Sequence, residues 1–168
     1  GNWERLPPGK SEPAATEYGE WLIKAYQHWY ENQPQLTIRR FEEILEHCLG
    51  GAGSVEYFGV EPAGLVTVAT DGAFEAVDQI KSAYDGAEYT GLDIFKNSLD
   101  DVVSHPLTQQ RLLGTASLAD ECLECPNLYE CGGGYFPHRY SASRDYKNPT
   151  IYCADYMRLF ASVKGHIG

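Results

Sequence analysis

The sequence has few basic residues and no long apolar run. Lys and Arg together number 13 among 168 residues, against 24 Asp and Glu, so the formal net charge is -11. Such a charge repels phosphate backbones and anionic lipid surfaces, and we expect neither a nucleic acid nor a membrane as a partner. The apolar runs are shorter than the roughly 18 residues of a spanning helix, and the first twenty residues do not have a signal-peptide layout. We therefore expect a cytoplasmic protein.

Cysteine is also scarce, but its distribution is uneven. There are five cysteines, and four of them fall in the last third of the chain. An odd number with this clustering favours a metal site in a reducing compartment over a disulfide framework. The remaining one, Cys48, is expected on the apolar face of a helix, where it acts as a small buried hydrophobic residue.

The apolar spacing predicts an α+β fold with a short β-hairpin. Steps of three and four residues predict helices over residues 16–30 and 39–49, with a short strand at 36–38 between them. Residues 65–70 and 73–77 are expected to pair around a two-residue Asp-Gly turn. Short helices are expected after Ser98 and over 107–113, and a closing helix from 150 onward carries Cys153 in its first turn.

The clustered cysteines have the spacing of metal ligands. Cys122 and Cys125 form a two-residue-spaced pair, and Cys131 is followed directly by three glycines. Backbone without Cβ atoms can approach a cluster and point N–H groups at its sulfurs. Cys153 supplies a fourth thiolate. We favour one 4Fe-4S cluster over a structural zinc, because zinc commonly takes two such pairs and this chain has one.

The sequence around these cysteines resembles the SPASM domain of radical SAM enzymes. The resemblance is carried by CLECPNLYECGGGY, then HRYS, then NPTIYCADY. It implies an auxiliary iron-sulfur lobe that follows a partial TIM barrel and accompanies the modification of peptides. The four cysteines then match the ligands of the family's outer auxiliary cluster: Cys122, Cys125, Cys131 and Cys153.

The same family pattern leaves the inner auxiliary cluster incomplete in this chain. Tyr135 and Val77 stand where the family has cysteines, so a single cluster is expected here. Asp78 stands where sulfatase-maturing members place an aspartate that is proposed to accept a proton, so the resemblance makes it a candidate catalytic base. An aspartate that follows a hairpin strand is otherwise commonly a solvated or turn-capping residue.

The rest of the chain resembles the cyclophane-forming, FxsB-type group of peptide maturases. The matching stretches include YGEWLIKAYQHWY, TIRRFEEILEHCLGG and VTVATDGAFEAVDQIK. This resemblance implies a ribosomal precursor peptide as the partner and side-chain cross-linking as the reaction.

The CxxxCxxC motif that binds the radical-generating cluster is absent from the sequence. S-adenosylmethionine and a second 4Fe-4S cluster are therefore expected in a missing barrel domain or subunit, and this segment alone is expected to be inactive. The expected organisation is an irregular lead-in over 1–16, the last elements of a truncated barrel over 17–52, a bridging region with the hairpin over 53–118, and the cluster-binding lobe with its closing helix over 119–168.

Two other functions are compatible with the cysteine pattern. One is a zinc-stabilised or metal-free module that binds a peptide or a partner without a redox role. The other is a ferredoxin-type electron carrier, which would leave most of the chain before the cysteines unexplained. Arg139, near the Gly-rich loop, is expected either in an ion pair of the fold or in contact with a peptide carboxylate or the surroundings of the cluster.

Overall fold

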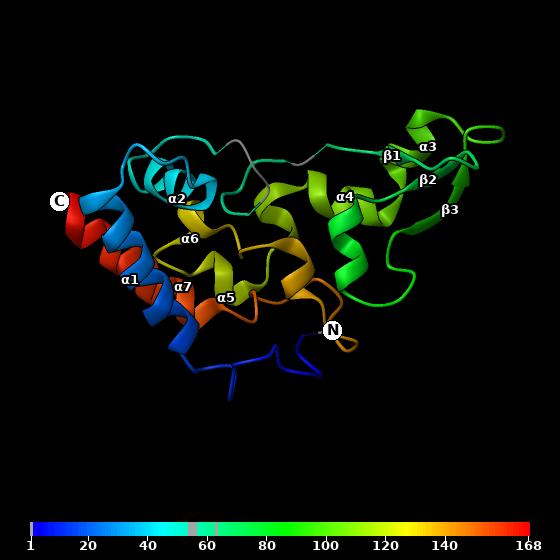
Figure 1. Ribbon diagram of the computed structural model, residues 1–168. Helices are drawn as coiled ribbons and strands as arrows, with labels where there is room; N and C mark the ends of the chain where they lie inside the picture. The colour runs from blue at the N-terminus through cyan, green and yellow to red at the C-terminus, as the bar shows by residue number, and fades with distance from the viewer. Residues whose placement is uncertain (1, 54–56, 63) are drawn as a thin grey trace.

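The computed structural model describes residues 2–53, 57–62 and 64–168. A bundle of helices lies at one end of the molecule, a small antiparallel sheet lies at the other, and the cysteine-bearing segment runs between them (Figure 1). This arrangement confirms the predicted α+β class. No helix in the described ranges is long and apolar enough to cross a membrane.

Three helices form the larger core. They are α1 (Glu17–Asn32), α2 (Arg39–Cys48) and α7 (Cys153–Ile167). Their apolar stripes meet around Tyr26, Ile44 and Phe160, each of which is fully buried. Burial of an apolar side chain such as Ile44 or Phe160 contributes roughly 1.5–3 kcal/mol. The helix that begins at Cys153 is therefore fixed by the two N-terminal helices, while the assignment of residues 17–52 to a truncated barrel stays a prediction.

The short strand predicted at residues 36–38 is wrong. These residues form a bend at Leu36 and an extended approach to α2. The carbonyl of Leu36 accepts a hydrogen bond from Trp29 Nε1 at 2.7 Å, so this segment is paired with α1. Its β-favouring residues pair with none of the described strands, and strand propensity depends on such neighbours.

The predicted hairpin is present, with a different turn. Strand β1 (Thr67–Val68) pairs antiparallel with β2 (Ala73–Glu75). Ala69 N–H donates to the Ala73 carbonyl at 2.9 Å, which leaves three residues in the loop, and only Gly72 in it has a positive φ. A three-residue loop that ends in a left-handed glycine is a common alternative to the two-residue turn.

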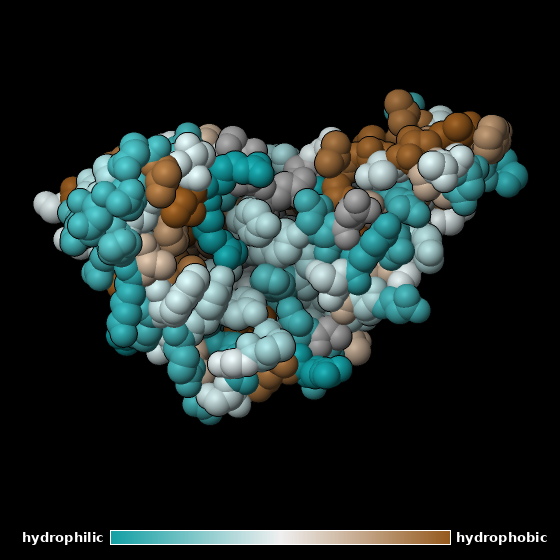
Figure 2. All heavy atoms as spheres, viewed as in Figure 1, coloured by the Kyte–Doolittle hydropathy of each residue, from teal (hydrophilic) through white to brown (hydrophobic). Residues whose placement is uncertain are grey.

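A third strand, β3 (Tyr89–Asp93), pairs with β2 and was not predicted. Its sequence contains Gly91 at a positive φ and lacks clean apolar alternation. The five-residue 3₁₀ helix η1 (Asp78–Ser82) connects the hairpin to β3. The sheet end of the molecule presents a hydrophobic face in Figure 2, with exposed side chains that include Val68, Ile94 and Phe95.

Six short helical segments lie between β3 and α7, and two of them carry cysteines. They are α3 (Leu99–Ser104), α4 (Pro106–Leu112), η2 (Gly114–Ser117), α5 (Asp120–Leu123), α6 (Leu128–Cys131) and η3 (Phe136–Arg139). Ser98 caps α3 as predicted, and Pro106 opens α4 after the break at His105.

Candidate metal centre

The four predicted cysteine ligands line one cavity. Cys122 lies in α5, Cys125 follows that helix, Cys131 ends α6 and Cys153 begins α7. All four border a cavity of about 50 Å³ between these segments. The structure thus brings together side chains that are up to 31 positions apart (153 − 122). Tyr156, Met157 and Phe160 of α7 complete the wall.

The thiols of this cavity affect one another electrostatically. Burial raises the pKa of Cys122 to about 11, Arg139 opposes this shift, and Cys153 and Cys125 add to it. Burial also raises the pKa of Cys131, with further increases from Cys153, Cys122 and Cys125. Burial and Cys125 raise the pKa of Cys153, while Lys10 lowers it. Metal coordination offsets the cost of ionising these buried thiols, because a coordinated thiol is deprotonated.

The Gly-rich loop after Cys131 has a left-handed backbone at three successive residues. Gly132, Gly133 and Gly134 all have positive φ angles, at 57°, 78° and 71°. The N–H of Gly133 donates to the Cys131 sulfur and lowers the pKa of that thiol. A Cβ atom at Gly134 would lie 2.7 Å from Thr150 Cγ2. The loop can therefore pass between Cys131 and Thr150 only without side chains.

A polar group beside Cys125 was not predicted. Asn127 N–H donates to Cys125 Sγ at 3.4 Å, and Asn127 Nδ2 contacts Met157 Sδ at 3.2 Å. Lys164 Nζ donates to Asn127 Oδ1 at 2.9 Å and fixes the orientation of the amide. Met157 could have been found, because it lies one helical turn after Cys153. Asn127 carries no comparable sequence signal.

The cysteines surround the cavity without meeting at a single point. In the described part of the chain, no three His, Cys, Asp or Glu side chains are grouped so that they could hold one metal ion. The shared cavity and the mutual pKa shifts nevertheless place all four sulfurs in one electrostatic environment.

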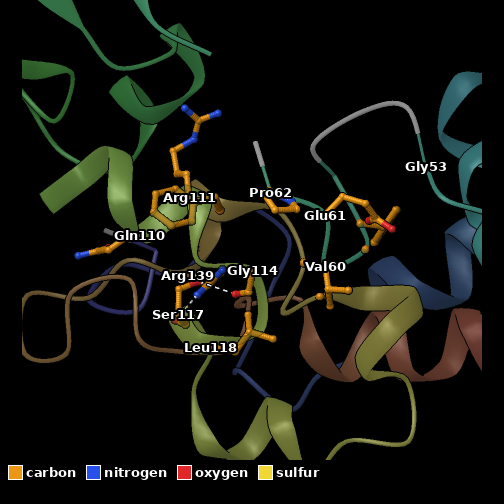
Figure 3. A pocket seen from close by; sticks show the side chains of 15 residues that line it. Gly53, Val60, Glu61, Pro62, Gln110, Arg111, Gly114, Ser117, Leu118 and Arg139 are labelled. Atoms are coloured by element: carbon orange, nitrogen blue, oxygen red, sulfur yellow. Dashed lines mark hydrogen bonds between the residues drawn. The ribbon is translucent and has the colours of Figure 1, made fainter. Parts of the chain in front are cut away.

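A second cavity lies on the other side of the Gly-rich loop. It has a volume of about 290 Å³ and is bordered by Gly132, Gly134 and Arg139. Figure 3 shows Arg139 hydrogen-bonded to Ser117 at one side of this cavity and Val60 with Glu61 at the other. The loop is therefore a thin wall between the cysteine cavity and a larger pocket.

The positions where the family has inner-cluster cysteines hold apolar and aromatic side chains. Val77 is buried just before η1. The Tyr135 ring stacks on Tyr57 with centroids 4.7 Å apart and meets His138 edge-on at 4.9 Å. Asp78 is the first residue of η1, but its side chain lies outside the described part of the structure. Its predicted role stays a prediction.

Cys48 is separate from the other four cysteines. It packs against the larger core at the end of α2, and burial raises its pKa to about 11. The prediction of a small buried hydrophobic residue is consistent with this position.

No protein-family model and no curated protein matches the chain. Several solved structures match the chain. The chain is similar to native anSMEcpe with bound AdoMet and Kp18Cys peptide, with a TM-score of 0.72 and 19% identity over 97% of this chain and 44% of that one. Native anSMEcpe with bound AdoMet matches with the same TM-score and identity, over 96% of this chain and 43% of that chain. A third structure of the same protein, with bound Cp18Cys peptide, also has a TM-score of 0.72, with 19% identity over 96% and 44%.

These neighbours are structures of a SPASM-domain radical SAM anaerobic sulfatase maturase, and this chain spans less than half of their length. The likeness concerns the fold, because the identity is low. The chain thus has a SPASM-type α+β fold, in which the cysteine cavity lies between α7 and the segments around α5 and α6.

Proposed function

We propose that this chain is the auxiliary-cluster segment of a radical SAM enzyme that modifies a peptide. One observation carries the proposal: Cys122, Cys125, Cys131 and Cys153 line a single cavity in a fold shared with radical SAM maturases. The cluster they would hold is a single 4Fe-4S cluster.

The donor set fits such a cluster. Each iron of a 4Fe-4S cluster takes one thiolate, so its ligands are distributed around a cavity. One zinc instead needs four sulfurs about 2.3 Å from the same atom. The arrangement around the cavity, the apolar wall and the N–H of Gly133 aimed at Cys131 all suit the distributed ligand set.

When bound, the cluster supplies a site that accepts or releases one electron. The residues of this chain hold and shield it. Tyr156 and Phe160 border the cavity from the buried face of α7 and keep water from it. Asn127, held by Lys164, donates its backbone N–H to Cys125 and stabilises a thiolate there.

The substrate class in this proposal is a peptide. Two neighbouring structures of anSMEcpe contain a bound peptide, and all of those described above contain AdoMet. The radical-generating cluster and S-adenosylmethionine belong in this proposal to a barrel domain or subunit that carries the CxxxCxxC motif. The ribosomal origin of the peptide and the cross-linking reaction of the FxsB-type group rest on the sequence resemblance.

Cysteine variants test the ligand assignment. We expect Cys125→Ala and Cys153→Ala, prepared without oxygen, to lose most of their iron and sulfide, because removal of one thiolate of four destabilises the cluster. Cys48→Ala is the matched control, since it also removes a partly buried cysteine but lies in the helical core. Iron retained by the first two variants, with native circular dichroism, would contradict the proposal.

A further inference from the structure

Arg139 is a buried cation that has no anionic partner in the part of the chain that the structure describes. Its side chain lies in η3 and the residue is 4% exposed. Its Nε donates to the Tyr146 carbonyl at 3.1 Å and its Nη2 donates to the Ser117 carbonyl at 2.9 Å. The guanidinium also lies over the Phe136 ring, 5.2 Å from its centroid. These partners are all neutral, so the ion pair expected from the sequence is not formed within the described ranges.

Such a charge needs compensation. A guanidinium stays protonated in proteins, and a buried charge is costly unless an opposite charge faces it. The chain compensates another buried cation in this way: Lys10 pairs with Asp155 at 2.7 Å. Two backbone carbonyls offer Arg139 only partial charges.

The cysteine cavity lies next to Arg139, on the other side of the Gly-rich loop. Gly133 borders that cavity, and a Cβ atom on Gly133 would lie 3.6 Å from Arg139 Nε. Burial lowers the pKa of Arg139, while Cys122 and Cys131 raise it. Arg139 thus lies directly behind the Gly-rich loop, within electrostatic reach of two of the four proposed ligands.

We propose that Arg139 is the fixed counter-cation of the cluster and sets its reduction potential. The inference rests on the proposed function. A cluster held by four thiolates carries net negative charge that increases by one on reduction, and nearby charge is one of the factors that set its potential. A positive charge held close by in a low-dielectric region stabilises the reduced form more than the oxidised form. Arg139 is thus a positioning and electrostatic residue that does not itself bind iron.

The test compares Arg139→Gln with Arg144→Gln. Arg144 also lies near Cys122, but it is exposed and paired with Glu121 at 3.0 Å. Each variant removes one positive charge. We expect Arg139→Gln to lower the midpoint potential, measured by redox titration with electron paramagnetic resonance. The expected decrease is a tenfold change in the reduction equilibrium, about 59 mV for one electron. We expect Arg144→Gln to leave the potential near that of the unchanged protein, because solvent screens its charge.

Iron and sulfide content distinguishes a failure of the proposed function from a failure of the role proposed for Arg139. Unchanged protein without a cluster would overturn the proposed function itself. A cluster-loaded Arg139→Gln variant with an unaltered potential would overturn the role of Arg139 alone, and a peptide-binding defect without a potential shift would do the same. If Arg139→Gln loses its iron, Arg139→Lys decides the question. Lysine keeps the charge without the planar fork, so restored iron content supports the counter-cation and lost iron contradicts it.

Discussion

At the residue scale, the Lys10–Asp155 pair connects the irregular N-terminal segment to the helix that carries Cys153. Lys10 Nζ donates to Asp155 Oδ2 and to the Ala15 carbonyl, both at 2.7 Å, and Gly19 N–H donates to Asp155 Oδ1 at 2.7 Å. Both charged side chains are almost completely buried. This contact holds the lead-in against α1 and α7.

We expect Asp155→Ala to lower the free energy of unfolding by about 3–5 kcal/mol, because it leaves the Lys10 ammonium buried without an anionic partner. Urea denaturation measures the change. The control is Glu121→Ala, which breaks the exposed pair with Arg144 and should cost about 1 kcal/mol or less. Equal losses in the two variants would show that burial of the Lys10 pair does not matter.

Gly134 and Gly165 allow a second comparison between matched variants. Gly134 has a φ of 71° and no space for a Cβ atom beside Thr150, whereas a Cβ atom on Gly165 in α7 would have no described neighbour within 4 Å. We expect Gly134→Ala to destabilise the protein by about 1–3 kcal/mol. Gly165→Ala should stabilise it by about 0.5–1 kcal/mol. Thermal or urea unfolding distinguishes the two signs, and a neutral Gly134→Ala would contradict the geometry of the loop.

The grouping of the four cysteines could be predicted at this scale, because closely spaced cysteines commonly share one site. The two-residue gap between Cys122 and Cys125 and the glycines after Cys131 indicated a shared site, and all four cysteines do border one cavity. The isolation of Arg139 from the described carboxylates could not be predicted. It depends on how η3 packs against residues from distant parts of the chain, and a sequence pattern does not contain that information.

At the element scale, helix α3 depends on its N-terminal cap. Ser98 Oγ accepts from Asp101 N–H at 3.2 Å, and Asp101 Oδ2 accepts from Ser98 N–H at 2.8 Å. The hydrogen bonds from the backbone and side chain of Ser98 lower the pKa of Asp101. A carboxyl group whose pKa is lower in the folded state contributes stability above its unfolded pKa and loses it as the pH falls.

This relation predicts a pH-dependent effect of Asp101→Ala. The variant should be less stable than the unchanged protein near neutral pH. The difference should decrease as the pH falls below the unfolded value of roughly 3.9 and on through the lower folded pKa. Asp100→Ala is the control, because Asp100 lies in the same helical turn outside the cap. Urea midpoints between pH 7 and 3 measure the difference, and a difference that grew on acidification would contradict the sign.

Elements with strong local signals were predicted and elements that depend on neighbours were not. The stripes of α1 and α2 and the cap of α3 are local, and their structures agree with the predictions. Strand β3 exists because β2 offers it a partner, whereas residues 36–38 pair with none of the described strands. Strand formation is a property of the pair, so single segments predict it poorly.

At the scale of the whole molecule, the cysteine cavity is placed by the packing of α7 against the N-terminal helices. Cys153 begins α7, and the buried residues of that helix contact α1 and α2 in the larger core. The fourth proposed ligand is therefore fixed by residues far from the other three cysteines. Residues 17–52 and residues 119–168, which the sequence analysis assigned to separate regions, both contribute side chains to this core.

The most direct test of the proposed 4Fe-4S cluster is the iron, sulfide and zinc content of the chain prepared without oxygen, together with its visible absorption spectrum. We expect about four irons and four sulfides per chain and a broad visible absorption. One zinc per chain, without sulfide or visible absorption, would contradict it and assign Cys122, Cys125, Cys131 and Cys153 a structural role instead.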